Sequence, residues 1–409
     1  MSADAPPLRR NRDYTLLWIG VSLSGIGSSA SLVAYPLLVL ALTGSPAKAG
    51  IVGAANWLPY VLFQLWAGAL VDRWNKRTTM LVCSGLNALA VASVAIAYAA
   101  GVLTLWQLVL VAFVDRTLTT FFTPAEATAL ARVVPLGQLP EAVGRNDARE
   151  HIATLLGPPL GGALFGLWAA APFVADAASY GASFAAASAL RTPLRPTAPG
   201  EENGRPRVLD GLRFIWTVPF LRASLFQAAG TNLTWSALTL TLVVVARDRG
   251  ASGLEVGAML ALLGVGGLVG SALSGRLLAR FSLPAIVLGS VWIWTGLIAL
   301  LVAADDPFVL GAISGAAFLV GPTWNGAVVG ATMTLTPDHL RGRVTAADAL
   351  VSFGARPLGL LAVGYLDQAV DGHVAFAVIA GWTLLVAGVS TLSPALRHGP
   401  FADAVGNTA

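Results

Sequence analysis

The sequence predicts an all-α membrane protein in which twelve transmembrane helices form two parallel six-helix repeats. The chain has 409 residues, only 11% of them charged, and a mean hydropathy of +0.72. Long apolar segments follow one another along it, and about 20 apolar residues are enough to cross a bilayer as a helix. Because such helices satisfy their own backbone hydrogen bonds in lipid, this composition indicates a polytopic helical membrane protein and excludes a soluble globular one.

Twelve apolar segments can be counted, and each is predicted to be one membrane-spanning helix. The segments run over 15–42, 49–71, 78–100, 104–131, 146–168, 171–190, 217–246, 254–278, 283–303, 307–335, 345–368 and 373–393. The first is too long for a signal-peptide core, so we expect it to be retained. The one long polar connection, Arg191–Arg213, is rich in proline and predicts a flexible linker. The expected domains are an N-terminal bundle over 1–190, the linker over 191–213, a C-terminal bundle over 214–396 and a tail over 397–409.

Positive charges are distributed unevenly between the two sets of loops. With the N-terminus inside, only Lys48, Arg247 and Arg249 face outward, whereas the inner loops hold most of the arginines. Cytoplasmic loops of membrane proteins carry such an excess of arginine and lysine. The pattern predicts a multi-pass protein of the cell membrane with both termini in the cytoplasm.

The two halves of the sequence share landmarks in the same order. The matched pairs are Gly68–Trp74 with Gly275–Phe281, Pro158–Gly161 with Arg356–Gly359, and Pro124 with Pro322. In the second copy of the first landmark, Ala279 stands where Asp72 is expected. This order predicts two repeats related by an axis along the membrane normal, with a binding site between them near the midplane.

The short loop Gly68–Arg77 connects the second and third predicted spans. It reads Gly-Ala-Leu-Val-Asp-Arg-Trp-Asn-Lys-Arg and resembles the Gly-x-x-x-Asp-Arg-x-x-Arg-Arg loop of the major facilitator superfamily. The resemblance implies that superfamily's fold and a cytoplasmic gating loop, in which the matching residues are Gly68, Asp72, Arg73, Lys76 and Arg77. The alternative is a basic turn that only sets the orientation of the chain.

The fifth predicted span resembles the antiporter motif of the drug-efflux branch of that superfamily. The matching residues are Gly144, Gly157, Pro158, Gly161 and Gly162, whereas Ala153 replaces one glycine of the motif. Glycines four residues apart let a neighbouring helix approach closely, and proline bends a helix. The resemblance implies antiport, and ordinary tight packing is the alternative. The wider run from Phe122 to Gly162 resembles macrolide-type and siderophore exporters.

Ionisable residues inside predicted spans are candidates for proton coupling, because charges are costly in lipid. The candidates are Asp115, Glu126 and Arg356. Asp115 is preferred, because it lies near the midplane on the same helix face as Thr119 and Glu126, where burial disfavours its charged form. Glu126 can instead be hydrated at the cytoplasmic edge, and Arg356 can be a structural cation or a partner of Asp115.

The resemblance also implies that spans one, four, seven and ten line the substrate cavity. The candidates for substrate contacts are Tyr35, Arg116, Asn232, Trp235, Trp324 and Asn325. Tryptophan and tyrosine also gather at membrane interfaces, which is the alternative for the aromatic members of this set.

These observations predict a secondary active transporter that exports an amphipathic small molecule, such as a drug, secondary metabolite or siderophore, by alternating access and proton antiport. An uptake symporter or facilitator, or a non-transporting receptor, is the alternative. We expect a monomer in the lipid bilayer, with no nucleic acid, no cofactor and the proton gradient as energy source. One cysteine and four scattered histidines suggest no metal site. Without a nucleophile–base pair or a Walker-type loop, neither an enzyme nor ATP-driven transport is expected.

Overall fold

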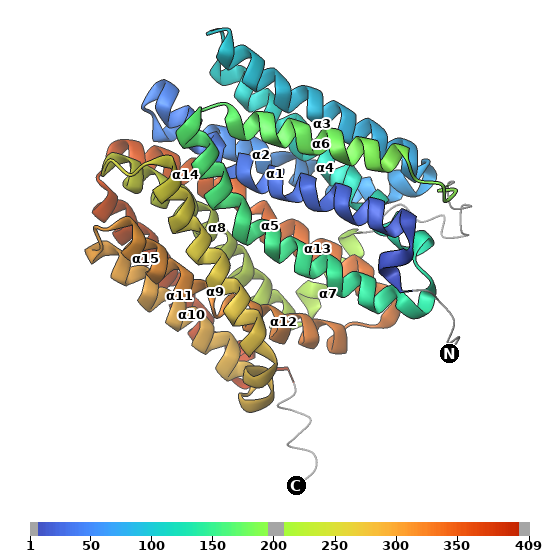
Figure 1. The fold of residues 1–409 in the computed structure, drawn as a ribbon. Helices are drawn as coiled ribbons and strands as arrows, with labels where there is room; N and C mark the ends of the chain where they lie inside the picture. Colours follow the sequence, from blue (N-terminus) through green and yellow to red (C-terminus); the bar gives the residue numbers. More distant parts are fainter. Residues whose placement is uncertain (1–6, 195–207, 401–409) are drawn as a thin grey trace. The chain divides into compact units, whose positions relative to one another are not determined.

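The structure is a computed structural model that describes residues 7–194 and 208–400 (Figure 1). Within these residues the regular structure is helical and no strand occurs. The predicted all-α fold is therefore confirmed. Residues 195–207 of the predicted linker and 401–409 of the predicted tail lie outside the described part.

Two compact units divide the chain. Unit 1 comprises Met1–Gly44, Ala55–Arg205 and Ser252–Gly257, and unit 2 comprises Ser45–Ala54, Pro206–Ala251 and Ala258–Ala409. The main division along the sequence, between Arg205 and Pro206, falls within the predicted linker. Each unit is described by itself below.

Unit 1 contains the first group of helices, coloured blue to green in Figure 1. They are α1 (Arg12–Thr43), α2 (Pro46–Arg73), α3 (Lys76–Ala99), α4 (Leu105–Val133), α5 (Leu139–Leu167) and α6 (Ala171–Ser188), with short 3-10 helices at Leu8–Arg10 and Leu136–Gln138. The first residues of α2, up to Ala54, belong to unit 2. Helix α1 packs against both α5 and α6, and α3 packs against α4 and α6 (Figure 1). This arrangement turns one face each of α1, α4 and α6 towards the interior of the unit.

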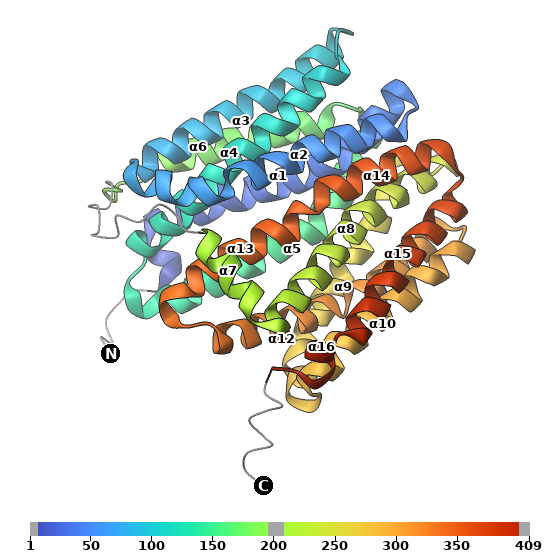
Figure 2. The ribbon, with the colours of Figure 1, turned by 180° about the vertical axis from the view of Figure 1, so that it is seen from behind.

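Unit 2 contains the later helices, whose neighbours are clearest in Figure 2. They are α7 (Val208–Thr217), α8 (Pro219–Asp248), α9 (Gly253–Arg280), α10 (Leu283–Leu300), α11 (Pro307–Phe318), α12 (Gly321–Leu335), α13 (Arg341–Gly354), α14 (Arg356–Ala369), α15 (Gly372–Leu392) and α16 (Pro394–His398), with 3-10 helices at Leu301–Ala303 and Asp338–Leu340. The first residues of α9, up to Gly257, belong to unit 1. Helix α8 lies against both α14 and α15, and α10 lies against α15 (Figure 2).

Polar residues directly before several helices explain where those helices begin. The side chain of Asn11 accepts a hydrogen bond from a backbone amide of α1, Asn75 from amides of α3, and Thr104 from an amide of α4. Asp306 and Asp371 do the same for α11 and α15. Each cap satisfies an amide that has no partner inside its helix, which stabilises the helix by about 1 kcal/mol.

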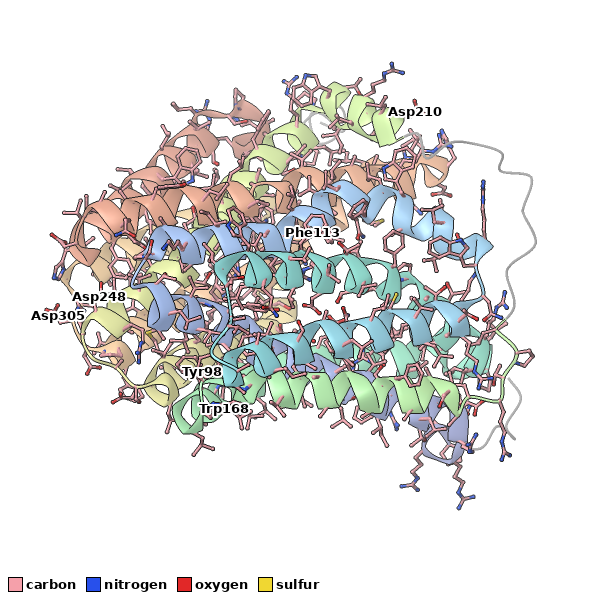
Figure 3. The ribbon with its side chains drawn as sticks, turned by 90° about the horizontal axis from the view of Figure 1, so that it is seen from above. Tyr98, Phe113, Trp168, Asp210, Asp248 and Asp305 are labelled. Carbon is pink, nitrogen blue, oxygen red and sulfur yellow. The ribbon has the colours of Figure 1, made fainter. Side chains whose placement is uncertain are left out.

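Every predicted span coincides with a helix or with a pair of consecutive helices. Nine of the described helical segments are long and apolar enough to cross a membrane, and α2, α5 and α6 are outside that set. Near one end of unit 1, Tyr98 and Trp168 bring their rings together, with centroids 6.1 Å apart (Figure 3). Aromatic residues at helix ends are typical of a membrane interface.

Two predicted spans are broken, and part of the predicted linker is helical. The tenth span breaks between α11 and α12, before Pro322, and the eleventh breaks at Ala355, before Pro357. Proline cannot donate a backbone hydrogen bond, so it fits the first turn of a new helix better than a helix interior. The prediction of a flexible linker is wrong for Val208–Arg213, which belongs to α7.

Candidate functional site

A group of four side chains, two of them buried and two partly buried, joins three helices of unit 1. Tyr180 of α6 donates a hydrogen bond to Asp115 Oδ1 of α4 at 2.7 Å. Ser28 Oγ of α1 lies 2.9 Å from the hydroxyl of Tyr180 and 3.4 Å from Asp176 Oδ1 of α6. Asp176 is only 1% exposed and Tyr180 7%. We call Asp115, Tyr180, Ser28 and Asp176 the carboxylate cluster.

Asp176 is the functional candidate that sequence reasoning missed. It lies inside the sixth predicted span, 171–190, surrounded by alanine and other small residues. The rule that selected Asp115, a carboxylate within an apolar span, also selects Asp176. The signal was therefore present in the sequence, but the link between the two residues was not. Asp115 and Asp176 lie 61 positions apart, and only the packing of α4, α1 and α6 brings them together.

Arg116, the sequence neighbour of Asp115, is held by α2. Its Nη2 donates to Asn56 Oδ1 at 3.3 Å, and its guanidinium lies over the ring of Trp57, 4.4 Å from the centroid. Asn56 is 5% exposed and donates to the carbonyl of Ala112 at 3.4 Å. The positive charge of Arg116 is therefore fixed beside the carboxylate cluster. Whether Arg116 touches a substrate remains a prediction.

Glu126 forms a buried ion pair with Arg149 of α5. Arg149 Nη1 lies 3.0 Å from Glu126 Oε1, and the two side chains are 8% and 11% exposed. The pairing holds Glu126 against α5, and the role of Glu126 in proton coupling stays a prediction. Arg149 lies inside α5 and is itself buried. Removing one member of a buried pair leaves an uncompensated charge, so the two residues depend on each other.

A polar cavity of about 190 Å³ lies within unit 1 between these two groups. Its lining includes Ser28 and Tyr180 of the carboxylate cluster, the Glu126–Arg149 pair, and the polar residues Ser24, Ser84, Asn87, Thr119, Thr123 and Ser183. Asn87 is 2% exposed, and among the described residues its Oδ1 has no hydrogen-bond donor. A buried polar atom of this kind is a preferred contact for an internal water molecule, and the cavity volume is sufficient for several.

Part of the antiporter-like motif packs α5 against α1. A Cβ at Gly157 would collide with Ser29, and a Cβ at Gly161 would collide with the backbone of Ala30. Gly144 and Gly166 face open space. These two contacts join α5 to Ser29 and Ala30, the α1 residues that directly follow Ser28. Pro158 lies within α5, which continues through it.

Two basic residues of the predicted gating loop, Lys76 and Arg77, donate hydrogen bonds to backbone carbonyls. Lys76 is completely buried, and its Nζ donates to the carbonyl of Asp72 at 2.6 Å. Arg77 donates from Nε to the carbonyl of Ala187 at 3.2 Å, and from Nη2 to that of Ser188. These carbonyls lie at the C-terminal end of α6, where cations are stabilised. The loop is therefore fixed to α6, whereas the Asp72 side chain is exposed.

In unit 2 the structure brings together two predicted residues, Arg356 and Asn232. Arg356 Nε donates to Asn232 Oδ1 at 2.8 Å, and its guanidinium lies over the ring of Phe353, 4.6 Å from the centroid. The contact joins α14 to α8. A carboxylate, Asp367, accepts hydrogen bonds from Thr241 of α8 at 3.1 and 3.2 Å.

The remaining predicted substrate contacts are dispersed. Tyr35 packs edge-on against Phe173 in unit 1 and is 5% exposed. In unit 2, Trp235 packs against the ring of Phe318. Trp324 donates to Gln227 at 3.0 Å, and Asn325 is exposed. Their roles as substrate contacts stay predictions.

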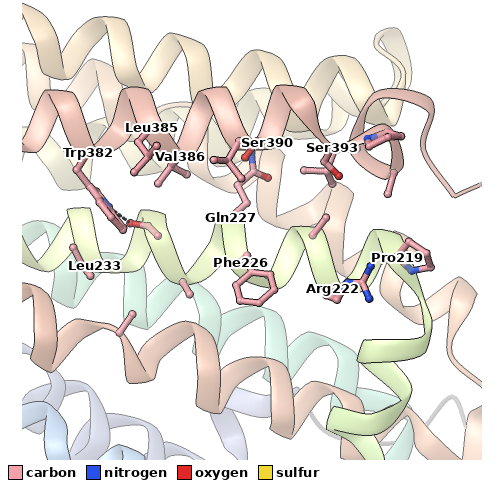
Figure 4. A pocket seen from close by; sticks show the side chains of 18 residues that line it. Pro219, Arg222, Phe226, Gln227, Leu233, Trp382, Leu385, Val386, Ser390 and Ser393 are labelled. Atoms are coloured by element: carbon pink, nitrogen blue, oxygen red, sulfur yellow. Dashed lines mark hydrogen bonds between the residues drawn. The ribbon is translucent and has the colours of Figure 1, made fainter.

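A largely apolar groove of about 660 Å³ lies in unit 2 between α8 and α15 (Figure 4). Phe226 and Leu233 of α8 face Trp382 and Leu385 of α15 across it. Polar groups are few, and Arg222 lies towards the end next to Pro219 (Figure 4). A cavity of this size and composition fits an apolar or amphipathic small molecule.

Comparison with known proteins identifies the family. A model described as transmembrane secretion effector, of the major facilitator class, matches residues 2–407. The chain belongs to this family of membrane transporters.

Named relatives and a solved structure agree with that family. The multidrug efflux pump Tap of Mycolicibacterium fortuitum is 30% identical over 407 residues, covering 94% of this chain and 96% of the relative. Macrolide efflux protein A of Streptococcus pyogenes is 27% identical over 155 residues, 38% of each chain. A crystal structure of the nucleoside transporter NupG superposes with a TM-score of 0.78 at 14% identity, covering 93% of this chain and all of that one. At this identity the superposition supports the fold alone.

Proposed function

We propose that the protein exports an amphipathic small molecule from the cell by alternating access, and that proton entry drives the export. The similarity to a multidrug efflux pump along almost the whole chain supports the export of drug-like compounds. The observation that carries proton coupling is the link through hydroxyl groups between Asp115, which is partly buried, and Asp176, which is buried, in unit 1.

The coupling step follows from the cost of burying charge. An ionised carboxylate in a water-poor interior is unstable unless it is paired, and it becomes neutral when it takes up a proton. In this proposal Asp115 binds a proton when the site is open to the outside and releases it when the site is open to the inside. Arg116, fixed by Asn56 and Trp57, favours the ionised state from which the next proton is taken up.

The substrate class rests on the aromatic and apolar lining of unit 2. The groove between α8 and α15 offers a large apolar surface with Arg222 and Gln227 as polar contacts. A molecule with an apolar body and one polar group fits such a lining, and molecules of this kind partition into membranes. We propose drug-like compounds of this type as the substrates.

Transport in everted membrane vesicles tests the proposal. Ethidium and erythromycin serve as probes, with an imposed pH gradient, acid inside. Uptake into the vesicles that a protonophore abolishes is expected, because everted vesicles turn export into uptake. Uptake that persists without a gradient would indicate a facilitator, and accumulation only in right-side-out vesicles would indicate an uptake symporter. Asp115→Asn is expected to lose gradient-driven transport, whereas Asp248→Asn, an exposed carboxylate at the end of α8, is the control.

A further inference from the structure

We propose that Asp115 and Asp176 form one proton-binding site that holds a single proton, and that this proton moves between them through Tyr180 and Ser28. The role of this site in transport rests on the function proposed above, but the site itself can be tested without any substrate. Asp176 thereby becomes a second member of the coupling site.

The hydrogen-bond geometry provides a continuous chain. Three oxygen–oxygen contacts link the four groups: 2.7 Å from Tyr180 to Asp115, 2.9 Å from Ser28 to Tyr180, and 3.4 Å from Ser28 to Asp176. Each hydroxyl can donate one hydrogen and accept another. Such a chain conducts a proton in either direction by reversing its donors.

Counting hydrogens indicates how many protons the chain needs. Tyr180 and Ser28 supply one hydrogen each, and three contacts must be filled. With one carboxyl proton all three contacts have one hydrogen each. Without a carboxyl proton, one contact has no hydrogen. With two carboxyl protons, one hydrogen has no acceptor in the chain. When the Ser28 hydrogen leaves the chain it has an alternative acceptor, the carbonyl of Ser24 at 2.8 Å.

The transfer is balanced at every atom. Protonated Asp176 donates to Ser28 Oγ, Ser28 donates its own hydrogen to the oxygen of Tyr180, and Tyr180 donates its hydrogen to Asp115. Transfer along this chain ends with Asp115 protonated and Asp176 ionised, and with both hydroxyls intact. The reverse sequence restores the first state, so no oxidant, reductant or other reactant is needed.

The surroundings favour a single negative charge on the pair. The hydroxyls of Ser28 and Ser179 lie 3.4 and 3.3 Å from Asp176 Oδ1 and can stabilise its charge, whereas Asp115 at the other end of the chain carries a charge of the same sign. Arg116 supplies one positive charge next to Asp115. Tyr35 on α1 is also close enough to interact electrostatically with both carboxylates. Two ionised carboxylates beside one fixed cation repel each other in a buried site, so they share a proton.

Gly27 has no side chain, and this leaves room for the side chain of Asp176. A Cβ at this position would collide with Ser179 Oγ and lie 2.8 Å from Asp176 Oδ1. Gly25, two residues earlier on α1, has only Ala153 Cβ within reach, at 3.7 Å. Alanine at Gly27 therefore displaces Asp176 from Ser28, and alanine at Gly25 is a matched control.

The polar cavity gives protons a way to reach the pair. Ser28 and Tyr180 form part of its lining, and the Glu126–Arg149 pair forms another part. Asn87 also lines this cavity, and its Oδ1 has no hydrogen-bond partner among the described residues. Water in this cavity completes the path from Glu126 to the hydroxyls of the carboxylate cluster.

Infrared difference spectroscopy on the purified full-length protein, titrated with acid and base in lipid nanodiscs, tests the proposal. The measured signal is the carbonyl stretch of a protonated carboxyl group. We expect Asp115→Asn and Asp176→Asn each to move the pH midpoint of this signal, and the double variant to lose it. Tyr180→Phe and Gly27→Ala are expected to change the midpoint too, whereas Gly25→Ala and Asp248→Asn leave it unchanged.

The outcomes separate this proposal from the proposed function. An Asp176→Asn protein with the midpoint and the pH profile of ethidium transport of the wild type would overturn the shared site, even if Asp115→Asn stops coupled transport. Coupled transport that survives both substitutions would instead overturn proton coupling at this place, whatever the infrared signal. Elution of each variant as a monodisperse peak on size exclusion checks that it is folded.

Discussion

The two units have repeated helices but differ in which of these helices carry ionisable side chains. In unit 1, α4 carries Asp115 and Glu126, and α6 carries Asp176. The matching stretches of unit 2, residues 307–335 and 372–392, contain no aspartate, glutamate, lysine or arginine. Unit 2 instead has Arg356 and Asp367 on α14, each held by one polar side chain of α8. The difference teaches that repetition of a fold conserves helix packing but not chemistry, and it places the proposed proton site in one repeat.

Helix continuity differs between the units as well. Pro124 and Pro159 lie inside continuous helices of unit 1, whereas their partners Pro322 and Pro357 follow breaks in unit 2. Leu319 and Val320 form one break, and Ala355 forms the other. Proline removes the same backbone donor in each case, so the local sequence and packing decide whether the helix bends or breaks.

The largest effect is expected when one carboxylate of each unit is neutralised in turn, which tests whether proton coupling belongs to unit 1. Asp115→Asn in unit 1 should lower pH-gradient-driven ethidium transport about 100-fold, the scale typical of a lost proton-transfer group. Asp367→Asn in unit 2 should retain most of the activity, because Thr241 can hydrogen-bond to an amide as well. Initial rates in everted vesicles measure both. Equal losses in the two variants would contradict the assignment of coupling to unit 1.

A second test compares how much two ion pairs, each with an arginine of α5, contribute to stability. Arg149→Ala leaves Glu126 buried without its partner and should cost about 3–5 kcal/mol. Arg145→Ala removes the exposed pair with Glu141, whose side chains are 44% and 55% exposed, and should cost less than about 1 kcal/mol. Unfolding of the detergent-solubilised protein, followed by tryptophan fluorescence, measures the difference. Similar stability of both variants would contradict the assignment of Glu126 and Arg149 as a buried ion pair.

The contact between α5 and α1 gives a third test within unit 1. Leucine at Gly161 must displace the backbone of Ala30, and overpacking of this kind typically costs about 1–3 kcal/mol. Leucine at Gly166 meets open space. We expect Gly161→Leu to reduce transport strongly and Gly166→Leu to have little effect. Comparable transport in the two variants would show that close packing at Gly161 is dispensable.

The smallest expected effect concerns the contact of α14 with α8 in unit 2. Asn232→Leu removes the acceptor of Arg356 Nε, and hydrogen bonds to charged groups contribute about 1.5–3 kcal/mol. Because Arg356 also lies over Phe353, we expect the lower end of that range and an unchanged pH profile of transport. A shifted pH profile would assign Arg356 a part in coupling and weaken the contrast between the units.

The sequence predicted the helices well because each depends mainly on local composition. Apolar segments and their boundaries, the repeat and the gating-loop motif can all be found by position along the chain. The contacts of the candidate site depend on packing between distant residues. Nothing in the sequence places Tyr180 against Asp115, or Arg149 against Glu126, since several helix rotations fit the same apolar pattern. Asn232 and Arg356 were each predicted, but their hydrogen bond was not, because it depends on how α8 lies against α14.

Some misses have a more specific cause. Asp176 lies among alanines in a short span, and its significance depends on its distance from Asp115. The breaks before Pro322 and Pro357 were not predicted, because proline inside a membrane helix is compatible with either a bend or a new start. The helix Val208–Thr217 follows a proline-rich stretch, whose composition suggested a continuous flexible segment.

Because Lys76 is buried, a reagent that modifies amines is expected to react with one lysine side chain of this protein. The chain has two lysines, and Lys76 is inaccessible with its ammonium group on backbone carbonyls. Lys48, at the start of α2, is exposed. Apart from the terminal amine, a reagent that modifies amines therefore has one side chain to attack. A membrane-impermeant ester added to intact cells should label Lys48 if the proposed orientation is correct, so one modified residue reports the sidedness of the whole transporter.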